Sequence, residues 1–144
     1  MRHRSVLVVL LVVLAGAVAF AQGPPTPAAA VTSPVYDGTS PLLPKFKIID
    51  AATSGNNEIV AAVSSYKIRV LAAVFTMTGT STTIRFESGA DGVALTGQMQ
   101  PSQGQTITLP FNPVGWFEST TALNLELGGA QSVDGAITYV EVAQ

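Results

Sequence analysis

From residue 45 onward the chain consists of short stretches in which apolar and polar side chains alternate, separated by clusters of turn-forming residues. In residues 83–87, Ile84 and Phe86 fall on one side and the charged side chains on the other. Residues 106–111 and 123–127 repeat this period of two, which is typical of a half-buried β-strand. About eight such stretches predict an all-β protein, a single β-sandwich or jelly-roll-like domain of short antiparallel strands.

Residues 58–77 admit two interpretations. Apolar side chains recur there at a spacing that approximates one face of a helix. The β-branched content and the Ser64-Ser65 break favour two strands instead, over residues 58–63 and 66–77. From Val70 onward the second segment is apolar on both sides, which predicts a strand that is covered on both faces.

Residues 1–21 have the pattern of a cleavable signal peptide. Arg2 and Arg4 precede an uncharged run from Val6 to Phe20, and the stretch ends in an Ala-Phe-Ala cleavage pattern at residues 19–21. A membrane-spanning helix needs about 20 apolar residues, and this run is shorter. Cleavage is therefore favoured over the alternative of a retained anchor. The protein is therefore expected outside the cytoplasm: extracellular, periplasmic or on the cell surface.

Residues 22–44 contain six prolines among small and polar residues, which predicts an extended linker or arm ahead of a domain at residues 45–144. The two apolar pairs Val35-Tyr36 and Leu42-Leu43 give this segment a means of docking on the domain. A mobile spacer is favoured over a docked arm because prolines and small residues dominate.

Removal of the signal peptide changes the charge of the chain. It takes away Arg2, Arg4 and the single histidine, His3, which leaves five of the seven Lys and Arg residues against nine Asp and Glu residues, a net charge of −4. Nucleic acids and anionic membranes bind clustered cations, so neither is expected as a partner of the mature chain. Expected partners are further copies of the chain, with a glycan or another surface protein as alternatives.

Most enzyme chemistry is excluded by residue type. The mature chain has no histidine and the whole chain has no cysteine, so it has no Ser-His-Asp or Cys-His system and no zinc site of the usual ligands. No catalytic residue, metal ligand or cofactor is assigned. A glycoside hydrolase that uses two carboxylates remains a remote alternative, although Glu87 and Glu126 are expected to be solvated.

Calcium is the one metal for which oxygen ligands are at hand. Asp50 with Asn56, Asn57 and Glu58 is one candidate set, and Asp91 in a turn is another. Neither has the spacing of a known calcium loop. Because Asn and Asp also form turns for backbone reasons, residues 54–57 and 88–92 are interpreted as turns.

Residues 111–117 form the least ordinary stretch, with the only tryptophan between other aromatics, Pro and Gly. Phe111, Asn112, Trp116 and Phe117 are candidate binding or interface residues, because aromatic side chains bind sugars and protein partners. A core or interface position is favoured for Trp116. A secreted carbohydrate-binding module that uses this loop is the alternative function.

A non-catalytic structural or assembly module is the preferred function. It is predicted to self-associate through apolar β-faces. The candidate self-association residues, taken from the doubly apolar segment and the last strand, are Leu71, Phe75, Met77, Val140 and Val142.

Several segments resemble small proteins of tailed phages and prophages, which are mostly uncharacterised and presumed to be virion structural or decoration proteins. They are residues 54–63, 66–71, 109–117, 122–125 and 139–142. The resemblance implies a β-sandwich that self-associates, with a trimer as one arrangement, and it carries no catalytic residues. A signal peptide has no use in a cytoplasmically assembled virion, so an exported relative of this domain is favoured over a virion protein.

Overall fold

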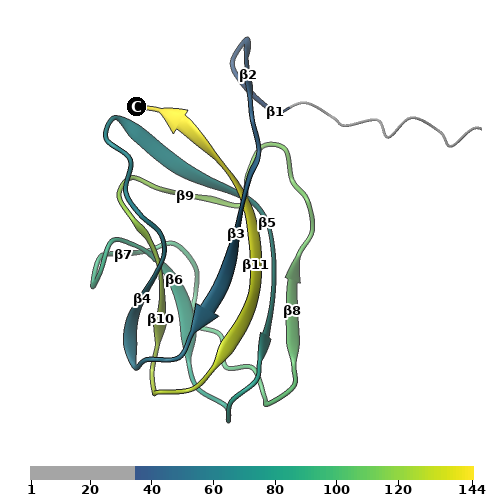
Figure 1. Cartoon of the computed structure of the whole chain (residues 1–144), viewed down its shortest axis with the longest axis vertical. Coiled ribbons are helices and arrows are strands. Elements are labelled where there is room, and N and C mark those ends of the chain that lie inside the picture. The colour runs from purple at the N-terminus through teal and green to yellow at the C-terminus, as the bar shows by residue number, and fades with distance from the viewer. Residues whose placement is uncertain (1–34) are drawn as a thin grey trace, which may run out of the picture. The chain divides into compact units, whose positions relative to one another are not determined.

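The computed structural model describes residues 35–144, which form eleven β-strands and no helix (Figure 1). No segment of this described part is a helix that could cross a membrane. The predicted signal peptide, residues 1–21, and residues 22–34 of the predicted linker lie outside the described residues. The strands are β1 (Val35–Asp37), β2 (Ser40–Leu42), β3 (Lys45–Ala51), β4 (Gly55–Val60), β5 (Tyr66–Met77), β6 (Ile84–Ser88), β7 (Val93–Ala94), β8 (Thr106–Leu109), β9 (Phe117–Ser119), β10 (Leu123–Leu127) and β11 (Val133–Ala143).

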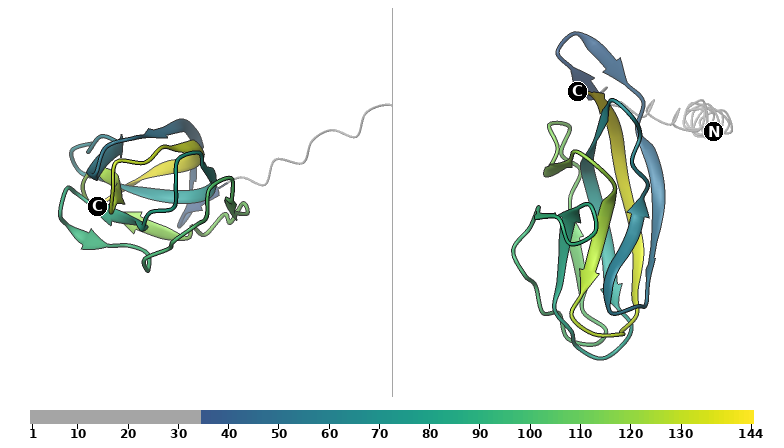
Figure 2. Two further views of the ribbon diagram at one scale, coloured as in Figure 1. Left: turned by 90° about the horizontal axis from the view of Figure 1, so that it is seen from below. Right: turned by 90° about the vertical axis from the view of Figure 1, so that its left-hand side faces the viewer.

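Two sheets pack face to face as a sandwich (Figure 2). One has the strand order β4-β10-β6-β7, and the other has the order β3-β11-β5-β8, with β9 paired to the remaining half of β5. The pairings are antiparallel, and strands β3 to β6 alternate between the two sheets, as in a jelly roll. The predicted all-β sandwich is confirmed.

The alternating pattern selects the side chains that fill the space between the sheets. Ile84 and Phe86 of β6 and the three leucines of β10 are buried there. Phe86 meets Phe75 of β5 edge to face, with ring centroids 5.8 Å apart, and this geometry adds to the stabilisation from burial. The core faces expected for residues 83–87 and 123–127 are therefore confirmed.

Strand β5 contains one residue more than the strand it pairs with. Thr138 of β11 lies opposite Ala72 and Tyr139 lies opposite Val70, so Leu71 is the extra residue of a β-bulge. Val70 before the bulge and Ala73 after it both face the core, whereas Leu71 belongs to a second apolar cluster. Residues 58–60 lie in β4 and residues 66–77 form β5, so the alternative of a helix is wrong, and the first predicted strand ends at Val60 and not at residue 63.

The segment around the apolar pairs of the predicted linker is folded. β1 and β2 form a two-stranded hairpin that turns at Gly38, whose φ of 58° lies in the left-handed region that glycine adopts easily. Val35 is fully buried and Leu42 partly buried in one cluster with side chains of β5 and β11. The part of the predicted linker from Val35 to Leu42 is therefore docked on the domain and is no mobile spacer, because burial of these side chains anchors it.

The turn expected at residues 54–57 is shorter than the sequence indicates. β4 begins at Gly55, so Asn56 and Asn57 lie in the strand. Asn57 still shapes the turn from there: its Oδ1 accepts from the Thr53 backbone N–H at 3.2 Å, and its Nδ2 donates to the Thr53 carbonyl at 2.9 Å. The turn-forming side chain is present as expected, but its own backbone pairs with β10.

Close approach of β11 to β5 gives a test of the fold. A Cβ on Gly135 would lie 2.1 Å from the carbonyl oxygen of Val74. We expect Gly135→Ala to lower the free energy of unfolding by about 1–3 kcal/mol, because one strand must shift to admit the methyl group. Gly97→Ala is the control, since its Cβ would meet nothing within 4 Å. Urea unfolding measures both, and equal effects would contradict the packing of these strands.

Candidate functional site

The outer face of the five-stranded sheet, on the side away from the core, carries two rows of mainly apolar side chains. Strand register gives their order: Ile48, Ala136, Val74 and Thr108 form one row, and Phe46, Thr138 and Ala72 form the other. Phe46 is 68% exposed and Ile48 63% exposed. We call these two rows the apolar patch.

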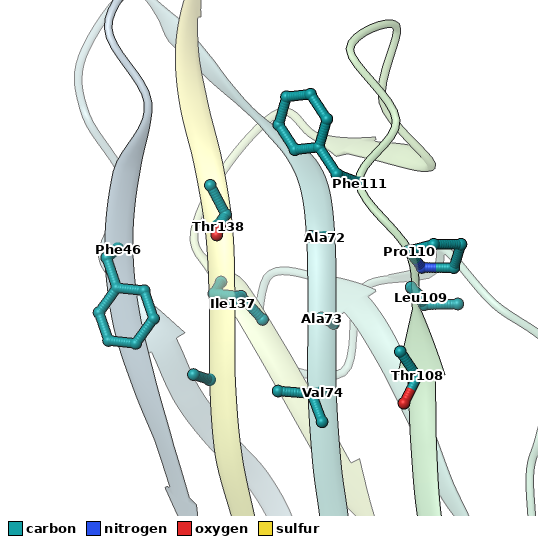
Figure 3. A pocket seen from close by; sticks show the side chains of 11 residues that line it. Phe46, Ala72, Ala73, Val74, Thr108, Leu109, Pro110, Phe111, Ile137 and Thr138 are labelled. Atoms are coloured by element: carbon teal, nitrogen blue, oxygen red, sulfur yellow. The ribbon is translucent and has the colours of Figure 1, made fainter. Parts of the chain in front are cut away.

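A groove with a volume of about 270 Å³ hollows the apolar patch. Phe46 on β3 and Phe111, just after β8, flank it, and Ala72 and Thr138 lie between them on β5 and β11 (Figure 3). Small side chains at the centre and aromatic rings at the sides produce the hollow. Its lining residues include no charged group, so the groove offers space for an apolar side chain and no acid–base chemistry.

The two ends of the apolar patch differ in charge. The next row across the sheet is polar, and its acidic members, Asp50 and Asp134, lie directly opposite each other. Beyond the other end lie Lys67 and Arg69, where the Arg69 Nε is 2.5 Å from Glu118 Oε1. The uncharged rows therefore separate an acidic end from an end where two cations are paired with Glu118 and Asp37.

The β1–β2 hairpin covers the part of the outer face that adjoins the apolar patch. Val35 packs there with Leu71, Val140 and Val142, all of which are buried. The bulge explains the position of Leu71, and strict alternation along β11 explains the two valines. The expectation that β5 is covered on both faces holds at Leu71, whereas the exposed Val74 leaves the outer side open further along.

None of the five predicted self-association residues presents a surface to another copy in this fold. Phe75 and Met77 are buried between the two sheets, and the other three are buried beneath the hairpin. A contact through any of them would require the core or the hairpin to open. Phe46 and Ile48 are exposed in their place. The alternation in residues 45–50 was the available signal, but it did not show that these two side chains point outward.

The loop after β8 is fixed by its own polar contacts. Asn112 Nδ2 donates to the Gly115 carbonyl at 2.9 Å, and Asn112 Oδ1 accepts from the Val114 N–H at 3.1 Å. The Trp116 backbone N–H donates to the Val70 carbonyl, and the indole Nε1 donates to the Pro110 carbonyl at 2.8 Å. The loop is therefore held beside the bulge of β5 with the indole ring in a defined position.

The four candidate binding residues of this segment have three different roles. Trp116 is 45% exposed and Phe111 is also exposed, so an interpretation of Trp116 as a core plug is wrong. Asn112 uses its side chain to build the loop. Phe117 faces inward and packs on Phe86 at 5.1 Å between ring centroids. Of these four residues, only Phe111 and Trp116 remain as candidates for contact with a ligand or partner.

The outer face of the four-stranded sheet holds a buried carboxylate. Glu87 is 0% exposed, which corrects the expectation that it is solvated. The Arg85 Nε lies 2.6 Å from Glu87 Oε1 and 2.5 Å from Glu126 Oε2, so one guanidinium serves two carboxyl groups. Burial raises the pKa of Glu87, its hydrogen bond with Glu126 raises that pKa further, and Arg85 opposes the shift.

The candidate calcium ligands are dispersed. Asp50 lies on β3 and Glu58 on β4, in different sheets. Asn56 Nδ2 donates to Asp91 Oδ1 at 2.9 Å, which ties β4 to the turn after β6. Across residues 35–144, no group of three or more His, Cys, Asp or Glu side chains is arranged to hold a metal ion.

Comparisons with known proteins give a weak structural likeness only. No protein-family model and no curated protein matches the chain. A solved chain from Bacillus endospore appendages, described as "a novel family of disulfide-linked pili", is 18% identical, with a TM-score of 0.47. The match covers 71% of this chain and 88% of that chain. This chain contains no cysteine, so it cannot form a disulfide link.

The buried Glu87 predicts an unusual dependence of stability on pH. The folded protein holds the Glu87 proton more tightly than the unfolded chain does. The stability contributed by this group is therefore full below the ordinary pKa of 4.5 and falls as the pH rises through the raised pKa of the folded state. We expect Glu87→Gln to raise Tm at pH 7 and to change it little near pH 4, because the amide carries no charge that burial disfavours.

Thermal unfolding between pH 4 and pH 8 measures this effect. Glu58→Gln, at an exposed position of β4 in the same sheet, is the matched control and should leave the profile unchanged. A profile that is the same for Glu87→Gln and the unchanged protein would contradict the assignment of the titrating group.

Proposed function

We propose that this chain is an exported, non-catalytic structural module that self-associates through the apolar patch. The observation that carries the proposal is the exposure of Phe46 and Ile48 on a face that also has a groove. Exposed apolar side chains that cluster on one face often mark an interaction site. A second layer of protein over the patch removes this surface from water.

Export rests on the predicted signal peptide, which places the folded domain outside the cytoplasm. The resemblance of several segments to small phage and prophage proteins favours a structural role in an assembly. An exported relative of such proteins, and not a virion component, accounts for both features.

The carboxylates offer little support for glycoside hydrolysis. Two catalytic carboxyl groups must face each other across a cleft that admits a sugar chain. Glu87 and Glu126 are instead bridged by Arg85, and Glu87 is closed to solvent. The groove in the apolar patch has no carboxyl group in its lining.

Sedimentation of the protein recovered after expression of the full chain tests the proposal. Intact mass first establishes whether residues 1–21 have been removed. At about 100 µM, where an interface of micromolar Kd is filled, we expect an assembly of at least two copies. Ile48→Ser should weaken it, because this side chain loses apolar contact area without disturbing the core. A monomer at this concentration would contradict self-association.

Val93→Ser is the matched control for this variant. Val93 is 72% exposed, as open to solvent as Ile48, but it lies on β7 of the other sheet. Its replacement should leave the assembly unchanged. Equal weakening by both variants would indicate general loss of apolar surface and not a contact through the apolar patch.

Carbohydrate binding is the second candidate function, because Trp116 is half-exposed and its indole is held in place through Nε1. A rigid exposed indole is suited to stack on a sugar ring. If the protein binds glycans there, tryptophan emission should change on titration with a glycan panel, and Phe111→Ala should reduce the affinity. Absence of any change in tryptophan emission across a broad panel of glycans would contradict this function.

A further inference from the structure

We infer that the apolar patch binds the same patch of a second copy in a two-fold arrangement, with Phe46 of each copy inserted into the groove of the other. This inference rests on the proposed function and specifies the contact. The patch combines an exposed aromatic side chain with a hollow beside it, and both lie on one face of one sheet. A two-fold interface requires this kind of self-complementary surface.

The size of the groove suits a phenylalanine ring. An apolar cavity of about 150 Å³ accommodates benzene, and the groove has a volume of about 270 Å³ with an open side. Phe46 and Phe111 at its sides supply aromatic surfaces against which an inserted ring can pack. The small side chains of Ala72 and Thr138 leave the depth that the ring requires.

Charge selects the relative orientation of the two copies. Asp50 and Asp134 lie directly opposite each other at one end of the patch. Lys67 and Arg69 lie towards the other end, where Glu118 pairs with both and Asp37 also pairs with Arg69. If the copies pointed the same way, the acidic rows would face each other. A two-fold axis that lies in the plane of the interface and runs across the strands instead places the acidic end of each copy near the end of its partner that carries Lys67 and Arg69, which avoids this repulsion.

The hairpin leaves this surface free for a second copy. It covers Leu71, Val140 and Val142, on the same face and next to the apolar patch. β2 ends at Leu42 and the chain then enters β3, so none of the described hairpin residues lines the groove. The intramolecular contact and the proposed intermolecular contact are therefore continuous parts of one apolar layer on this sheet.

Single-cysteine cross-linking tests the arrangement in a chain that has no cysteine of its own. Val74 lies in the middle of the apolar patch, paired with Ala136 on one side and Thr108 on the other. In a two-fold pairing its two copies lie close to the axis. We expect Val74→Cys to give a covalent dimer with a short bis-maleimide, whereas the control Val93→Cys should give mainly monomer.

Phe46→Ser provides an independent readout. Because Phe46 is mostly exposed, the variant should fold normally, as circular dichroism and thermal unfolding would verify. We expect its dimer dissociation constant to rise about tenfold or more, as for an anchor residue at an interface centre. The matched control is Val93→Ser, which should leave the constant unchanged.

The outcomes separate this inference from the proposed function. A protein that is monomeric in sedimentation at every concentration contradicts both. An assembly that forms without a Val74→Cys cross-link, resists Phe46→Ser, or sediments as a trimer overturns the two-fold contact and leaves self-association standing. A dimer that cross-links through Val74→Cys and dissociates with Phe46→Ser supports the inference.

Discussion

The pairing of β5 with β11, with one extra residue at Leu71, determines most of what lies on either side of the five-stranded sheet. Before the extra residue, Ile68 and Val70 face the core. After it, the inward side of β5 changes to Ala73, Phe75 and Met77. The bulge also turns Leu71 to the outer face, where Val35 of the hairpin packs on it. The bulge lies where the edge pairing of β5 changes from β8 to β9, and the intervening loop donates backbone hydrogen bonds to the Leu71 and Val70 carbonyls. The positions of the core side chains of β5, of the hairpin and of the loop after β8 thus all depend on this bulge.

The outer faces of the two sheets differ in which side chains they bury and which they leave exposed. On the four-stranded sheet, Arg85 pairs with both Glu87 and Glu126, so the buried carboxyl group has a partner within the protein itself. On the five-stranded sheet, the hairpin covers only part of the apolar surface, and Phe46 and Ile48 remain open to water. Burial of a charge is expensive unless it is paired, whereas exposed apolar surface can be covered by another molecule. This difference is why we place the contact between copies on the five-stranded sheet.

Sequence patterns located the strands better than they assigned their faces. The bounds of β5 and the inward leucines of β10 follow from periodicity and turn residues. In β3, however, the alternation of Phe46 and Ile48 with lysines suggests an apolar core side, whereas Ile49 and Ala51 are the residues that face the core. Similarly, Glu87 alternates with apolar residues as a solvated side chain would, yet it is buried beside Arg85. A period of two distinguishes two faces of a strand but does not state what covers each one.

The sequence by itself determined the all-β class, the sandwich and the lack of histidine and cysteine in residues 35–144, because these follow from local periodicity and residue type. Only the tertiary structure decided that the arm from Val35 to Leu42 docks, that the predicted self-association residues are buried, and that Phe46 and Phe111 flank a groove. These features depend on strand register and on contacts between segments far apart in the chain. A one-residue bulge exchanges the faces of a strand, and no local pattern in a single sequence fixes where the partner strand places it.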